Sequence, residues 1–131
     1  MKPLLKFVSF VLLAGVLFHI SCKKEYSCEN CGANKPPIAV AGSDRVITLP
    51  TDSVLLDGRQ SSDPDGTISS YLWTKISGPS SFTISSSSVA ITIVKILVEG
   101  VYQFELKVTD NGGLTAKDTI QITVINRLVN W

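Results

Sequence analysis

The residues best suited to chemistry in this 131-residue chain are three cysteines and a pair of turn aspartates. Cys22 follows an apolar leader, Cys28 and Cys31 form a Cys-Glu-Asn-Cys pair, and Asp63 and Asp65 share a Ser-Asp-Pro-Asp-Gly turn. A cysteine can carry a lipid or form a disulfide, and paired carboxylates can bind a hard cation such as calcium. We first ask which of these chemistries the composition allows.

The composition argues against catalysis and against nucleic-acid binding. The only histidine, His19, lies in the leader, so a Ser-His-Asp triad and a His-ligated metal site are excluded from residues 22–131. The serine run 85–88 has no base beside it. The formal net charge of +1 provides no basic surface for nucleic acid. We therefore expect no enzyme, with a small Asp-dependent hydrolase as a remote alternative.

Residues 1–21 are predicted to be an export leader. Lys2 and Lys6 precede an apolar run from 7 to 20. That run is shorter than the roughly 20 residues that a membrane-spanning helix needs, and polar sequence follows it at once. A cleaved signal peptide is the expectation, and a retained anchor helix is the alternative.

The end of the leader resembles the lipobox of bacterial lipoproteins, in which a cysteine is acylated and becomes the new N-terminus. Ile20-Ser21-Cys22 fits that box, whereas His19 stands where Leu is usual. Lys23-Lys24-Glu25 resembles a signal for the outer face of the outer membrane. The resemblance implies that fatty-acyl chains such as palmitate on Cys22 attach the protein to the bacterial envelope, at the outer membrane. An unmodified secreted protein is the alternative.

Cys28 and Cys31 lie in a predicted tether, residues 22–35, that ends at Pro36-Pro37. An exported chain meets an oxidising compartment, which favours a small disulfide between the two. Free thiols in a flexible stalk are the second interpretation. Redox or zinc chemistry is the third, although zinc needs four ligands and residues 22–131 offer three cysteines and no histidine.

Residues 36–126 consist of short apolar and β-branched runs separated by turn residues, with no helical period. The clearest run, 101–109, alternates apolar and polar side chains, and 119–124 repeats the alternation. Asn111-Gly112 lies between them and favours a positive φ in a tight hairpin. The pattern predicts an all-β sandwich of seven to eight strands, followed by a tail at 127–131. The predicted strands are 38–41, 45–49, 53–57, 67–76, 82–84, 89–94, 101–109 and 119–124.

Five blocks of residues in this region resemble a PKD domain, an immunoglobulin-like module. The resemblance implies an immunoglobulin-like β-sandwich that binds or spaces other domains outside the cell and does not catalyse a reaction. Thr74–Pro79, after the tryptophan of the third block, matches a subgroup of bacterial surface proteins and eukaryotic ectodomains. Arg59 and Gln60 stand where small residues are common in the family. The blocks are Pro37–Asp44, Val54–Gly58, Ser61–Gly66, Ile68 with Tyr71 and Trp73, and Gly100 with Tyr102 and Val108–Gly113.

The turn carboxylates allow two interpretations. Asp63 and Asp65 could form half of a calcium loop, with Asp44 and Asp110 as further loop carboxylates. An EF-hand is excluded, because its twelfth position falls on Thr74 instead of Glu. The other interpretation is that both aspartates bond to the backbone of their own turn. We expect no cofactor, and calcium at this turn is the alternative.

The aromatic residues also allow two interpretations. Tyr71 and Trp73 lie two apart on one strand and could stack on a sugar, but a tryptophan here is more often the core of an immunoglobulin-like sandwich. We therefore assign Trp73 and Tyr102 to the core. Phe82 and Trp131 are the better candidates for exposed contacts, and the alternative is that either residue caps the sandwich. The expected function is a surface module that contacts protein or polysaccharide, and the alternative is a carbohydrate-binding module, aided or not by calcium.

Overall fold

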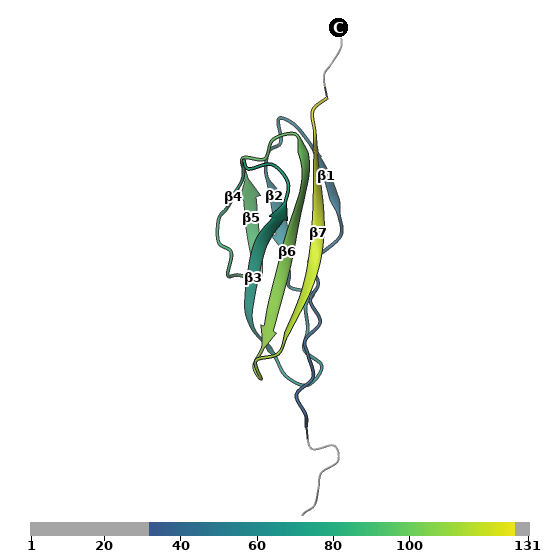
Figure 1. Cartoon of the computed structure of the whole chain (residues 1–131), viewed down its shortest axis with the longest axis vertical. Coiled ribbons are helices and arrows are strands. Elements are labelled where there is room, and N and C mark those ends of the chain that lie inside the picture. Colours follow the sequence, from purple (N-terminus) through teal and green to yellow (C-terminus); the bar gives the residue numbers. More distant parts are fainter. Residues whose placement is uncertain (1–31, 128–131) are drawn as a thin grey trace, which may run out of the picture. The chain divides into compact units, whose positions relative to one another are not determined.

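A computed structural model describes residues 32–127, and within that range the chain forms seven strands and no helix (Figure 1). The strands form a four-stranded sheet in the order β1-β7-β6-β3 and a three-stranded sheet in the order β2-β5-β4. All pairs of strands are antiparallel except β1 with β7. The predicted all-β sandwich is confirmed. The strands are β1 (Arg45–Thr48), β2 (Val54–Asp57), β3 (Ile68–Ser77), β4 (Thr83–Ile84), β5 (Ile91–Lys95), β6 (Gly100–Asp110) and β7 (Thr115–Ile125).

The long β6–β7 hairpin supplies most of the core face of the larger sheet. Because successive side chains of a strand point to opposite faces, an alternating sequence buries every second residue. Four alternate apolar residues of β6 are fully buried, the polar residues between them are partly exposed, and Val101 at the start of the strand is exposed. The alternation predicted for both strands is confirmed. The buried residues are Tyr102, Phe104, Leu106 and Val108 on β6 and Ile120, Ile122 and Val124 on β7.

The turn between β6 and β7 is a hairpin, as predicted, but its backbone differs from the expectation. The positive φ, 91°, falls on Gly113, and neither Asn111 nor Gly112 takes one. Two backbone bonds close the loop, from Asp110 N–H to the Leu114 carbonyl and from Gly113 N–H to the Asp110 carbonyl. The loop therefore spans four residues, and glycine is needed at its third position.

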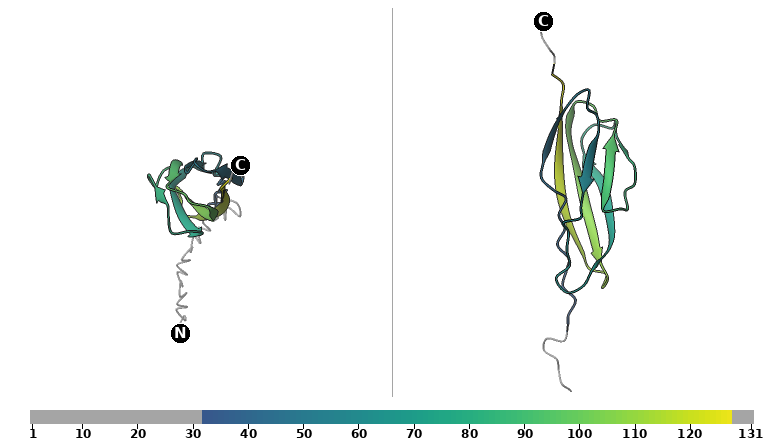
Figure 2. Two further views of the ribbon diagram at one scale, coloured as in Figure 1. Left: turned by 90° about the horizontal axis from the view of Figure 1, so that it is seen from above. Right: turned by 180° about the vertical axis from the view of Figure 1, so that it is seen from behind.

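The two aromatic residues assigned to the core lie between the sheets, which face each other when the domain is seen from above (Figure 2). Trp73 is 1% exposed, and its indole N–H donates to the Val89 carbonyl at 3.1 Å. The Tyr102 hydroxyl donates to the Ser81 carbonyl at 2.9 Å and accepts from the Val98 N–H at 3.0 Å. Each ring thus buries its apolar body while its polar atom is satisfied.

One predicted strand is wrong. The run 38–41 forms only an isolated bridge, between Ile38 and Ser62. The N–H of Val40 donates to the Ser61 hydroxyl at 3.0 Å, and the N–H of Ala41 donates to a carboxylate. Because side chains take these donors, no neighbouring strand pairs with the run.

The described segment enters the sandwich at one end and leaves at the other. The chain from residue 32 enters beside the β6–β7 turn, and β7 leads out at the opposite end (Figures 1 and 2). No helix in this range is long and apolar enough to cross a membrane.

Candidate functional site

Three carboxylates, one from the loop before β3 and two from the β6–β7 hairpin, hold the entry segment, residues 34–41, against the sandwich. Asp65 accepts the backbone N–H of Lys35 at 3.1 and 3.3 Å through its two oxygens. Asp118, on β7, accepts the N–H of Ala41 at 2.7 Å. Two residues assigned to the tether from sequence, Asn34 and Lys35, therefore contact the domain. We call the three carboxylates the entry carboxylates: Asp65, Asp110 and Asp118.

Asp110 makes the most bonds of the entry carboxylates. It is 2% exposed. Its Oδ2 accepts the side-chain amide of Asn34 at 2.8 Å. Its Oδ1 accepts the backbone N–H groups of Gly112 and Leu114, also at 2.8 Å. One buried carboxylate thus closes the β6–β7 turn and holds the entry segment, and these bonds compensate for its loss of hydration.

Asp63 lies near the same turn but is used differently from its neighbour Asp65. Its Oδ1 accepts only a long bond from the N–H of Asp65, at 3.4 Å. Its Oδ2 is shielded from solvent and has no hydrogen-bond partner in the described part of the chain. Burial of the carboxylate raises the pKa of Asp63, and the negative charges of Asp65 and Asp110 add to the rise.

The loop that carries Asp63 is clamped to the β6–β7 turn. Asn111 accepts the N–H of Thr67 at 3.1 Å through its side chain and donates its own N–H to the Thr67 carbonyl at 3.0 Å. Gly66 makes this approach possible, because a Cβ there would collide with side-chain oxygens of Asn111 and Asp63. The glycine of the Ser-Asp-Pro-Asp-Gly turn is therefore required by close packing.

Calcium needs about six to eight oxygen ligands, so free oxygens decide whether it fits here. The oxygens of Asp65 and Asp110 all accept bonds from the protein, and Asp63 alone keeps a shielded oxygen free. Between residues 32 and 127 no group of three or more His, Cys, Asp or Glu side chains is arranged to hold a metal. The calcium loop at Asp63 and Asp65 stays a prediction, and Oδ2 of Asp63 is the shielded oxygen that the described residues leave available to a cation. Asp44, the fourth predicted carboxylate, instead lines a groove elsewhere.

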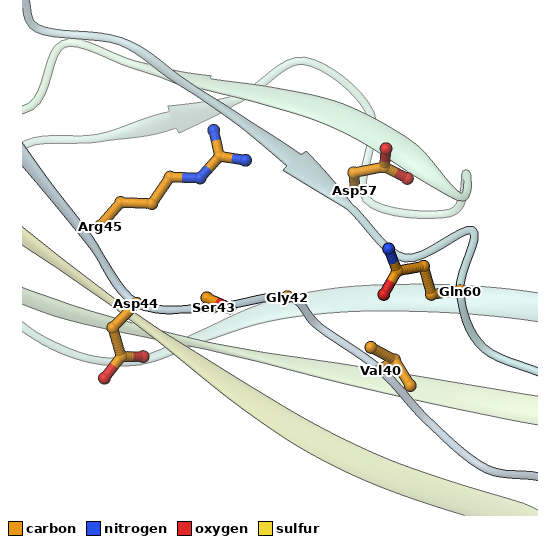
Figure 3. A pocket seen from close by; sticks show the side chains of 7 residues that line it. All are labelled: Val40, Gly42, Ser43, Asp44, Arg45, Asp57 and Gln60. Carbon is orange, nitrogen blue, oxygen red and sulfur yellow. The ribbon is translucent and has the colours of Figure 1, made fainter.

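That groove lies between the segment leading into β1 and the turn after β2, and its volume is about 530 Å³. Arg45 extends from one wall, while Asp57 and Gln60 come from the other (Figure 3). We call it the β1–β2 groove. It is lined by Val40, Gly42, Ser43, Asp44, Arg45, Asp57 and Gln60.

The two carboxylates of the β1–β2 groove are already engaged. Asp57 forms an ion pair with Arg59 at 2.8 Å. Hydrogen bonds from the side chain and backbone of Arg59 lower the pKa of Asp57 to about 2. Asp44 accepts the backbone N–H of Gln121 at 2.9 Å. Neither carboxylate depends on a ligand for a partner.

Three other groups lining the groove have no such engagement. The guanidinium of Arg45, the amide of Gln60 and the hydroxyl of Ser43 make no side-chain hydrogen bond or ion pair within residues 32–127. Sequence reasoning singled out Gln60 only as a departure from its family and did not select Arg45 or Ser43. No spacing rule marks them, because the two walls meet only in the folded chain.

The aromatic candidates lie elsewhere. Trp73 is buried and offers no face for stacking, and Tyr71 is partly buried against the core. Phe82 is partly buried against the core, which agrees with the interpretation that it caps the sandwich. Its ring packs 6.3 Å from the Phe104 ring, and the Lys75 ammonium lies 4.5 Å above it. The remaining candidates, Cys22, Cys28, Cys31 and Trp131, lie outside the described residues.

Comparison with known proteins matches this chain to one family of domains, both by sequence and by structure. The model of the family "K319L-like, PKD domain" matches residues 41–124. Low-density lipoprotein receptor-related protein 11 of Mus musculus is 44% identical over 95 residues, which are 72% of this chain and 20% of that protein. The chain thus spans about a fifth of the length of this curated relative.

Two solved structures extend the comparison. The solution structure of the PKD domain from KIAA 1837 protein has a TM-score of 0.66 and 36% identity, covering 71% of this chain and 90% of that one. A structure described as a promiscuous carbohydrate-binding module of the β-sandwich superfamily has a TM-score of 0.51 and 29% identity. That match covers 72% of this chain and 36% of the other.

Proposed function

Because the chain belongs to the K319L-like PKD domain family, we propose that it is a non-catalytic spacer and binding module at a bacterial cell surface. The observation that carries the proposal is the position of the chain's entry and exit. The entry carboxylates fix residues 34–41 at one end of the sandwich, and β7 leaves at the other (Figure 1). A module of this kind keeps the segments on its two sides apart, and exposes its sheets and grooves to a partner.

The anchor of the proposed module is a lipid on Cys22. Two or more acyl chains hold a protein on a membrane stably, whereas one chain binds only marginally. Cys22→Ser should therefore move the protein from the membrane fraction to the soluble fraction. Cys28→Ser is the matched control and should leave the protein in the membrane fraction. Unchanged fractionation of Cys22→Ser would refute the lipid anchor.

A polysaccharide is the partner that one observation favours. The β1–β2 groove holds unengaged polar groups, and the likeness to a carbohydrate-binding module at 29% identity is compatible with such a partner. The test is co-sedimentation of the purified chain with insoluble polysaccharides, in calcium and in chelator. Binding would support polysaccharide capture, and binding lost in chelator would show that calcium assists. Binding to none would leave a surface protein as the proposed partner.

A further inference from the structure

We propose that the β1–β2 groove binds a carboxylate of an acidic polysaccharide, a uronate, and that Arg45 is the residue that receives it. The proposal rests on the polysaccharide-binding part of the proposed function and deepens it by naming the site and the class of sugar. Four observations carry it: the unspent hydrogen-bonding groups, the charge, the size and the walls of the groove.

The side-chain groups of the groove that bond to no protein group are mainly hydrogen-bond donors. A guanidinium has five N–H donors and no acceptor, an amide has two donors and one acceptor oxygen, and a hydroxyl has one donor. Arg45, Gln60 and Ser43 line the groove without using these groups within the described residues. A ligand that complements them must be rich in acceptors, and a carboxylate accepts two parallel bonds from a guanidinium.

The local charge leads to the same class of ligand. The negative charge of Asp57 is compensated by Arg59 at 2.8 Å. Asp44 is bonded to the Gln121 N–H at 2.9 Å, and its carboxylate points away from Arg45 (Figure 3). The guanidinium of Arg45 makes no hydrogen bond or ion pair within residues 32–127, although its charge acts on Asp57 and contributes to the lowered pKa of that carboxyl. An anionic group is favoured beside this guanidinium.

The size of the groove suits a short stretch of a polar chain. Its volume of about 530 Å³ lies within the range of about 300–1,000 Å³ that is usual for ligand sites. None of its seven lining residues is aromatic, so the walls lack a platform on which a neutral sugar ring could stack. Recognition must then come from polar groups, which favours a charged sugar over a neutral one.

The walls favour a sugar over a peptide. A peptide that adds to a sheet needs a strand edge with free backbone groups. β1 begins only at Arg45 and β2 ends at Asp57, so the groove extends beyond both strands. At the far end of one wall, the N–H of Val40 is already bonded to the Ser61 hydroxyl. β1 and β2 are edge strands, but five of the seven lining residues lie outside them, so the groove offers a peptide little strand edge on which to add.

The experiment titrates the purified full chain with oligogalacturonate and with the same oligomer fully methyl-esterified, at physiological ionic strength. The esterified oligomer keeps the backbone and loses the charge. Arg45→Gln is the test variant. Lys107→Gln is the charge-matched control, because Lys107 lies on β6 on the side chain face opposite the core. Thermal unfolding of each variant verifies that it is folded.

The expected result is binding of oligogalacturonate and not of its ester, weakened at least about tenfold by Arg45→Gln, since a charge-assisted bond is lost. Arg45→Lys should lose less, because it keeps the charge, and Lys107→Gln should bind normally. Equal loss in Lys107→Gln would mean diffuse charge attraction and would overturn the site.

Other outcomes separate the inference from the proposed function. Tight binding of the ester, or binding that ignores Arg45, would overturn the inference while polysaccharide binding stood. No binding of any oligosaccharide, including alginate fragments as a second uronate, would overturn both the inference and the polysaccharide partner. Arg45-dependent binding of polyglutamate in place of oligogalacturonate would assign the carboxylate to a peptide and also overturn the inference.

Discussion

Two groups of polar side chains in this domain differ in what their hydrogen bonds do. The entry carboxylates give their oxygens to N–H groups of the protein, and they tie residues 34–41 to the rest of the sandwich. In the β1–β2 groove, the side chains of Arg45, Gln60 and Ser43 form no hydrogen bond or ion pair with the protein within residues 32–127. Groups that are satisfied internally stabilise a fold, whereas exposed groups at a concave surface that bond to no protein group are available to a ligand.

This difference separates residues that stand out in the sequence motifs from residues that are available to bind a ligand. Asp65 and Asp110 belong to the most conspicuous turns of the sequence, and the oxygens of both accept hydrogen bonds from the protein, from backbone N–H groups and from the side chain of Asn34. Arg45 belongs to no recognisable chemical motif. Its guanidinium nevertheless bonds to no protein group within residues 32–127 and is therefore available to a ligand. The comparison predicts that the entry carboxylates matter for stability and the groove residues for binding.

The largest effect should follow Asp110→Ala. The substitution removes three bonds to a buried carboxylate, two of which close the β6–β7 turn. Because bonds to charged groups contribute about 1.5–3 kcal/mol each and their loss is partly offset by hydration, we expect a loss of about 2–4 kcal/mol in the free energy of unfolding. Urea unfolding followed by tryptophan fluorescence measures it.

The control for this prediction is Asn34→Ala, which removes one bond of the three. It should cost about 1 kcal/mol. If Asp110→Ala cost no more than Asn34→Ala, the two turn bonds would contribute nothing, and Asp110 would not belong with the structural carboxylates.

A smaller effect should follow Asp118→Ala. This change removes the single bond to the N–H of Ala41, a residue that is fully buried. An unsatisfied buried N–H costs about 1–3 kcal/mol, and partial access of water should place the loss near the lower end. Asp52→Ala, at an exposed aspartate, is the control and should change stability by less than about 0.5 kcal/mol. Equal effects would remove Asp118 from the entry carboxylates.

The contrast between predicted and unpredicted features has a physical cause. The alternation of residues 101–109 is local, so the sequence alone revealed β6 and its buried face. The pairing of Ala41 with Asp118 joins residues 77 positions apart, and no local pattern encodes it. The failed strand at 38–41 has the same origin, because its donors are taken by side chains from distant segments.

The candidate site was harder to predict than the fold for the same reason. Asp63 and Asp65 are equivalent in the sequence, but the folded entry segment gives a donor to Asp65 and none to Oδ2 of Asp63. Likewise, Arg45 and Gln60 become one site only when two sheet edges come together. Residue types indicated possible chemistry, and tertiary contacts determined which groups stayed free.

Asp63 belongs neither to the entry carboxylates nor to the β1–β2 groove, and Asp63→Asn tests its carboxylate. The effect of this substitution on stability should be smaller than that of Asp118→Ala. The folded pKa of Asp63 is raised above that of an unfolded chain, so the ionised group destabilises the fold at neutral pH. This penalty decreases as the pH falls below the folded pKa and is gone below the pKa of the unfolded chain. The neutral isostere should therefore raise the midpoint of thermal unfolding at pH 7 relative to wild type, and this advantage should vanish in acid.

Two results would contradict this view of Asp63. A variant less stable than wild type at pH 7 would mean that the ionised carboxylate has a partner. A calcium-dependent rise in the unfolding midpoint of wild type, absent from Asp63→Asn, would identify that partner as calcium and would support the calcium loop expected from the Ser-Asp-Pro-Asp-Gly turn.

The smallest change in stability should follow Arg45→Gln. Its guanidinium bonds to no protein group among residues 32–127 and is exposed, so the free energy of unfolding should change by less than about 0.5 kcal/mol. Asp110→Ala should have the opposite effect, because it lowers the free energy of unfolding and leaves ligand binding in the β1–β2 groove unchanged. Urea unfolding of Arg45→Gln therefore tests the comparison itself. A loss above about 1 kcal/mol would mean that Arg45 holds the fold together, and the groove would then be structural like the entry carboxylates.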